Sequence, residues 1–119
     1  MLEAPDVVIF YDTLIAQPHP KMVACVEPSE GWFYRINSRP FLRPCVPLVR
    51  DPDHLFLEHD SYLQCQVLFS DDYLIEKCLR HRGMIGRISP ALKKEIIRWT
   101  FQARNISAEE SGKIAAALR

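Results

Sequence analysis

The chain has 119 residues, of which 48% are hydrophobic and 25% charged, and its formal net charge is zero. This length suffices for one hydrophobic core and is too short for two, so we expect a single domain over residues 1–119. Uncharged runs are short, and the run Thr13 to Pro20 is broken by prolines, which excludes a membrane-spanning helix. The N-terminus has no basic region followed by an apolar segment, so the sequence predicts no secretion signal and a cytoplasmic location.

The charges are arranged in blocks. Residues 1–34 carry a net charge of −4, residues 35–50 of +4, residues 51–76 of −7 and residues 77–104 of +7. If the basic blocks are exposed together, they produce a positive surface that attracts a polyanion. In the alternative arrangement the acidic and basic blocks face and neutralise each other.

Extended segments dominate the first part of the chain. A short β-branched or aromatic run predicts a strand at each of six places, Asp6–Tyr11, Lys21–Val26, Trp32–Ser38, Cys45–Val49, Leu55–Leu57 and Ser61–Phe69. The second and third runs are separated by Pro28, Ser29, Glu30 and Gly31, residues typical of a turn, which predicts a hairpin. Pro47 removes a backbone donor from the fourth run, so this strand is expected at a sheet edge or a bulge.

Helical signals follow. Ser70 is the predicted N-cap of a short helix near residues 71–79, with Asp71 and Asp72 in its first turn and Gly83 after its end. Residues 84–88 are predicted as a short strand. Ser89 and Pro90 are then typical of an N-cap followed by a proline in the first helical position.

Two helices are predicted at the C-terminal end. The inner stripe of the first contains Leu92, Ile96, Trp99, Thr100 and Ala103, widened by Ile97 and Phe101. Ser107 to Glu110 form a capping box that opens the second, whose inner face contains Ile114, Ala115 and Leu118. With the turn near Asn105, the two helices form a helical hairpin.

Strands first and helices last indicate an α+β fold. We expect a small, strongly curved antiparallel sheet or SH3-like barrel over residues 1–88, with the short helix near 71–79 included. Residues 89–119 form the C-terminal helical hairpin. Four isolated cysteines, in no CxxC pair, are expected to be buried reduced thiols, and no metal site or cofactor is predicted.

The order of four segments carries a family resemblance. HPKMVACV (residues 19–26), FYRINS (33–38), LEHDSYLQC (57–65) and GRIS (86–89) follow one another over about Asp6 to Ile106. In this order the chain resembles the toxin component of PemK/MazF-type toxin–antitoxin modules and phage or plasmid relatives with the same SH3-like barrel. The resemblance implies a homodimer, a small antitoxin as partner, and metal-independent cleavage of single-stranded RNA with the 2′-hydroxyl as internal nucleophile.

The resemblance also implies catalytic positions. The family's arginine before the aliphatic strand corresponds to His19 or Lys21, and its hydroxyl residue at the end of the next strand corresponds to Ser38. This chain departs from the pattern, since His19-Pro20 replaces Arg-Pro and Pro5-Asp6 replaces Gly-Asp.

The chemistry independently requires a base, an acid and a cation on the phosphoryl oxygens. An imidazole such as His19 suits proton transfer, Lys21 or Arg39 suits charge stabilisation, and Ser38 suits hydrogen bonding. The residues expected to contact nucleic acid are Tyr34, Arg35, Arg43, Arg80 and Arg82. A hydrolase triad of His59, Asp60 and Ser61 is not expected, because neighbours in sequence rarely converge in that way.

Two alternatives remain open. One is a non-catalytic barrel of the same fold that binds protein or nucleic acid. An active member is expected to gather four residues in one concave groove, Lys21, Ser38, Arg39 and His19, whereas a binding module could scatter them. The other is a DNA-associated accessory protein that uses the basic residues of its C-terminal helices, Lys93, Lys94, Arg98 and Arg104.

Overall fold

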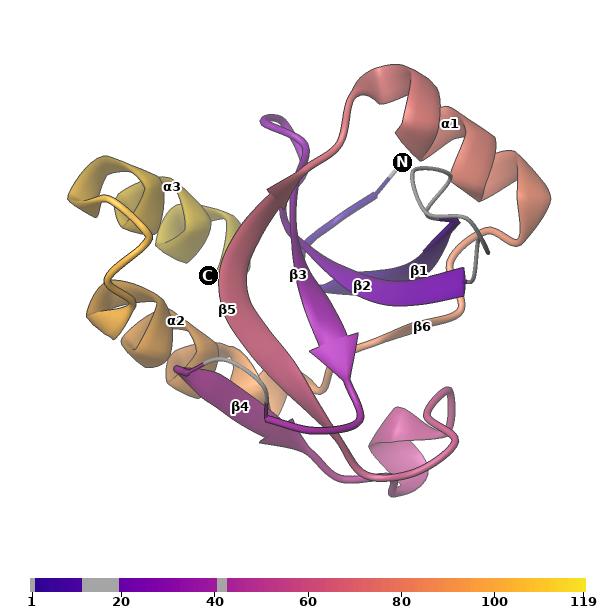
Figure 1. Cartoon of the computed structure of the whole chain (residues 1–119), viewed down its shortest axis with the longest axis horizontal. Helices are drawn as coiled ribbons and strands as arrows, with labels where there is room; N and C mark the ends of the chain where they lie inside the picture. The colour runs from indigo at the N-terminus through magenta and orange to yellow at the C-terminus, as the bar shows by residue number, and fades with distance from the viewer. Residues whose placement is uncertain (1, 12–19, 41–42) are drawn as a thin grey trace.

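The computed structural model describes residues 2–11, 20–40 and 43–119. Its centre is a six-stranded antiparallel sheet with the order β4-β5-β3-β2-β1-β6 (Figure 1). The strands are β1 (Asp6–Tyr11), β2 (Pro20–Glu27), β3 (Trp32–Asn37), β4 (Cys45–Leu48), β5 (Ser61–Phe69) and β6 (Gly86–Arg87). The helices are α1 (Asp72–His81), α2 (Lys93–Gln102) and α3 (Ala108–Leu118). The predicted α+β class is confirmed.

The sheet is curled into a half-barrel. Its register shifts between Cys25 and Glu27 on β2 and between Phe33 and Arg35 on β3, and such bulges bend a strand. The long strand β5, which lies between the edge strand β4 and β3, is strongly curved, and β4 pairs only with its first half, Ser61 to Gln64 (Figure 1). Pro47 does lie in an edge strand, because β4 is the last strand of the sheet order.

Each face of the sheet packs against helices. On one face Val26, Tyr34 and Leu63 join Ile96 of α2 and Ile114 of α3 in the main core. On the opposite face Val8, Val23 and Phe33 pack with Cys78 of α1 in a second, smaller core. Alternate residues of each strand therefore face different helices, which is why β2 is apolar at nearly every position.

Turns and caps follow the predicted chemistry. Gly31 closes the hairpin between β2 and β3 with a positive φ of 73°, and its carbonyl accepts a hydrogen bond from the Ser70 N–H. The Ser89 hydroxyl accepts from the Ala91 N–H and so starts the short 3₁₀ turn Pro90–Leu92 that leads into α2. The Ser107 capping box is present, and α2 contacts α3 as the predicted helical hairpin.

Some predictions at the element level were wrong. Residues 55–57 form no strand, because Asp51 caps a 3₁₀ turn at Pro52–His54 and the chain turns again before β5. The N-cap of α1 is Asp71 rather than Ser70, whose N–H is already bonded to Gly31. Phe101 does not widen the inner stripe of α2, since 53% of its surface is exposed.

The cysteines divide by exposure. All four are free; Cys25, Cys65 and Cys78 are buried and Cys45 is half-buried. Burial raises the pKa of the Cys25 thiol and of the Cys65 thiol to about 12, and it raises the pKa of Cys78 as well. Because the thiolate is the reactive form, these three groups are inert near neutral pH.

We therefore expect one thiol, Cys45, to react rapidly with a thiol reagent in the folded protein, and four to react after unfolding. Mass spectrometry after brief alkylation at about pH 8 identifies the modified residue. Rapid modification of Cys25 or Cys65 in the folded protein would contradict the packing described here.

Within the described ranges, none of the helices combines the length and the apolar character that a membrane crossing requires.

Candidate functional site

A polar groove of about 470 Å³ opens beside the ends of β2 and β3. We call it the β2–β3 groove. Its polar side chains come from β2, from β3 and the residue after it, from the segment at the start of β5, and from the residue after α1. They are Lys21, Arg35, Asn37, Ser38, Glu58, His59, Ser61 and Arg82.

Strand pairing brings the first of these residues together. Val23 of β2 lies opposite Arg35 of β3, and side chains two positions apart on a strand share a face. Lys21, Arg35 and Asn37 therefore project from the same face of the sheet, the face on which α1 packs. Arg82, the residue that caps the end of α1, adds a third cation to the groove.

His59 is held in one orientation by its neighbours. Its Nδ1 lies 3.0 Å from the carbonyl oxygen of Asp60, and the Ser61 hydroxyl donates to the His59 carbonyl at 3.0 Å. A carbonyl oxygen only accepts, so Nδ1 carries the proton in the neutral ring, and Nε2 is left with a lone pair. The exposed imidazole therefore supplies a proton acceptor to the groove.

Among the described residues that line the groove, three are basic, Lys21, Arg35 and Arg82, and one is acidic, Glu58. Arg87 has a different role, because its Nε donates to the buried Asp6 carboxylate at 2.7 Å and a second nitrogen lies 3.3 Å from Glu3, which raises its pKa. Arg87 therefore pairs with acidic residues of the N-terminal segment, as the alternative charge arrangement predicts for the basic blocks.

Four sequence-predicted site residues line this groove: Lys21, Ser38, Arg35 and Arg82. Arg39 is exposed next to Ser38 but does not line the groove. Arg80 is an exposed residue of α1 outside the groove wall. His19 lies outside the described residues, and Arg43 lines a different groove, which is described below.

The prediction that Tyr34 contacts nucleic acid was wrong. It was expected to stack on nucleic-acid bases, but it has no exposed surface, and its hydroxyl lies 2.8 Å from the Thr100 hydroxyl in the core. Burial also raises its pKa, since the phenolate has no solvent there. The other two aromatic residues of β3 supply no open stacking face, because Phe33 is fully buried and the Lys113 ammonium lies over the Trp32 ring.

Four polar groove residues were not among the predicted site residues: Asn37, Glu58, His59 and Ser61. Asn37 of β3 pairs with Tyr62 of β5, so the segment before β5, which contains His59, lies beside the end of β3. Both strands were predicted, so pairing them would have placed His59 near Ser38. Among the residues that the structure describes, no cluster of three or more histidine, cysteine or acidic side chains could hold a metal ion. The groove is suited to bind a polyanion and to accept a proton from it.

Comparison of the chain with protein-family models, with curated proteins and with solved structures gave no match. A fold of this kind hosts many activities, so functional assignment depends on the chemistry of the groove.

Proposed function

We propose that the protein is a metal-independent endoribonuclease that cleaves single-stranded RNA, as its resemblance to PemK/MazF-type toxins with an SH3-like barrel implies. The observation that carries this proposal is the convergence of Lys21, Arg35 and Ser38 with His59 on one groove. Of the four residues expected to gather in an active member, Lys21 and Ser38 line the groove, Arg39 does not, and His19 lies outside the described residues. The curled half-barrel is compatible with the same family.

The groove provides most of the groups that the reaction needs. His59 Nε2 accepts the proton of a ribose 2′-hydroxyl, whose oxygen attacks the adjacent phosphorus. The bond from phosphorus to the 5′-oxygen then breaks, which leaves a 2′,3′-cyclic phosphate and a 5′-hydroxyl. Lys21 and Arg35 stabilise the charge on the phosphoryl oxygens, and Ser38 donates a hydrogen bond to them. The sequence-based candidate for the acid that protonates the 5′-oxygen is His19.

The proposed partners follow from the same groove. We propose that a small antitoxin neutralises the protein by placing a segment with acidic side chains over Lys21, Arg35 and Arg82, where it would exclude RNA. We also propose that the protein acts as a homodimer, as the toxin family does. Both proposals depend on the nuclease assignment.

A non-catalytic RNA- or protein-binding role is the second candidate. Glu58 favours it, because a carboxylate in the groove wall lowers the positive potential that a phosphodiester needs. In this role His59 is only a polar group of the wall.

The deciding experiment is a cleavage assay on mixed-sequence single-stranded RNA in EDTA. We expect the parent protein to cut and Lys21→Ala to cut about 10-fold to 100-fold more slowly, because one stabilising cation is lost. Lys94→Ala is the matched control, since Lys94 is an exposed lysine of α2 that lines no groove described here. No cleavage by folded parent protein would assign the binding role instead.

A further inference from the structure

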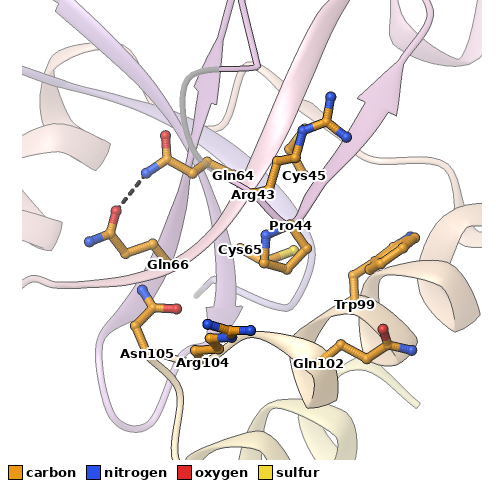
Figure 2. A pocket seen from close by; sticks show the side chains of 10 residues that line it. All are labelled: Arg43, Pro44, Cys45, Gln64, Cys65, Gln66, Trp99, Gln102, Arg104 and Asn105. Atoms are coloured by element: carbon orange, nitrogen blue, oxygen red, sulfur yellow. Dashed lines mark hydrogen bonds between the residues drawn. The ribbon is translucent and has the colours of Figure 1, made fainter.

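A second groove of about 550 Å³ lies between strands β4 and β5 and the C-terminal end of α2 (Figure 2). We call it the β5–α2 groove. Residues 43–45 form one wall, the carboxamides of Gln64 and Gln66 stand on β5, and Trp99 and Gln102 come from the last turns of α2 (Figure 2). Arg104 and Asn105, in the turn between α2 and α3, complete it.

The wall of this groove has an unusual composition. Two guanidinium groups, Arg43 and Arg104, accompany four carboxamides and an indole, with no carboxylate among the described residues that line it. Neither arginine has an ion-pair or hydrogen-bond partner within residues 2–11, 20–40 and 43–119. The Arg98 guanidinium lies 4.9 Å from the centre of the Trp99 ring, which adds a third cation beside the groove.

This groove is built for binding rather than for proton transfer. None of the described residues that line it is a histidine, and its buried thiol, Cys65, has a pKa that burial raises to about 12. Carboxamides pair with the edges of nucleic-acid bases, and guanidinium groups pair with phosphates. Bases must be unstacked for such contacts, which selects a single strand over a duplex.

A chain of hydrogen-bonded amides joins the two grooves. Asn37, in the wall of the β2–β3 groove, donates through Nδ2 to Gln64 Oε1 at 2.6 Å, and Gln64 Nε2 donates to Gln66 Oε1 at 2.6 Å (Figure 2). Gln64 is only 6% exposed, so these bonds fix its orientation. Gln66 is exposed, and its Nε2 donors have no partner among the described residues. A continuous chain of hydrogen-bonded amides therefore runs from Asn37, in the wall of the β2–β3 groove, to Gln66 in the β5–α2 groove.

We propose that the β5–α2 groove binds the nucleotides of single-stranded RNA that flank the cleaved bond, with Arg43 and Arg104 on phosphates and Gln66 on a base edge. The proposal rests on the nuclease function proposed above, because it gives the flanking nucleotides of that substrate their binding site. It makes the groove a determinant of affinity and of sequence preference, separate from the chemistry.

The first test measures binding by fluorescence anisotropy on the His59→Ala protein, with a labelled single-stranded RNA of about 12 nucleotides. We expect adding Arg43→Ala and Arg104→Ala together to weaken binding at least about 10-fold, and to reduce the salt slope by about 1.4 for two lost phosphate contacts. Arg119→Ala is the matched control, because Arg119 is an exposed arginine outside both grooves.

The second test uses the half-buried Cys45 in the groove wall as a reporter. Bound RNA should slow alkylation of Cys45, and the Arg43→Ala/Arg104→Ala protein should lose this protection at the same RNA concentration. Unchanged affinity together with unprotected Cys45 would overturn the proposal, and so would equally tight binding of an RNA duplex of the same sequence.

The two proposals fail in different ways. A parent protein that does not cleave, yet binds RNA through Arg43 and Arg104 and protects Cys45, would refute the nuclease and retain the groove as an RNA site. A parent that cleaves, with affinity and base preference unaltered in Arg43→Ala/Arg104→Ala and in Gln66→Ala, would refute the groove and retain the nuclease.

Discussion

Replacing His59 by alanine is expected to slow RNA cleavage by about 10²–10⁴-fold, the usual contribution of a positioned general base. The reason lies in the hydrogen bond from its Nδ1–H to the Asp60 carbonyl, which leaves Nε2 as the basic atom at the groove. Single-turnover rates of the parent and of the His59→Ala protein, measured on the same RNA in EDTA, give the size of the effect.

Two controls make the result specific. His81→Ala removes an exposed histidine of α1 that does not line the groove. This variant should cleave RNA at the parent rate. Thermal unfolding should show that His59→Ala is nearly as stable as the parent, since His59 is exposed. A His59→Ala protein with the parent rate would transfer the role of base to another group, with Glu58 as the nearest carboxylate in the groove wall.

Much of the fold could be predicted because local patterns carry it. The β-branched and aromatic runs gave β1, β2, β3 and β5 within one or two residues, and the Ser107 capping box gave the start of α3. Ser89 caps the 3₁₀ turn Pro90–Leu92, whereas α2 begins after it, at Lys93, with no side-chain cap. Residues 55–57 misled the prediction because Phe56 and Leu57 pack against the core without forming a strand, while Leu55 is exposed. Phe56 fills the space beside Gly86, where even a Cβ atom would collide with its ring. The local sequence around residues 55–57 cannot predict this contact, because Phe56 and Gly86 are thirty positions apart in the chain.

The site was predicted less completely than the fold. Lys21, Arg35 and Ser38 were placed correctly on adjoining strands, and the hairpin register then gathers them at one groove. Tyr34 was misassigned because its partner, Thr100, lies 66 residues further along the chain. The β5–α2 groove was missed for the same reason, since Arg43, Gln66 and Arg104 meet only once α2 packs over β4 and β5.

The second large effect is expected on stability. His54 is 3% exposed and joins two distant segments, with Nδ1 lying 2.9 Å from the Val49 carbonyl and Nε2 accepting from the Ser89 N–H at 3.0 Å. Its ring also makes an edge contact with Phe56, with the ring centres 5.7 Å apart. His54→Ala leaves a buried cavity and two unpaired backbone groups, so we expect the free energy of unfolding to fall by about 3 kcal/mol. Urea denaturation followed by circular dichroism measures it.

His54→Gln is the informative partner variant. A glutamine amide carries both a donor and an acceptor, so it can replace at least one of the two hydrogen bonds and should recover part of the loss. His59→Ala, the exposed histidine of the same segment, should change the unfolding free energy by less than about 0.5 kcal/mol. If His54→Ala and His59→Ala proved equally stable, His54 would not be the link between the turn before β5 and the start of α2. The two histidines would then contribute equally to the free energy of unfolding. His54 is buried and joins two segments through both ring nitrogens, whereas His59 is exposed and its contacts with Asp60 and Ser61 both use Nδ1.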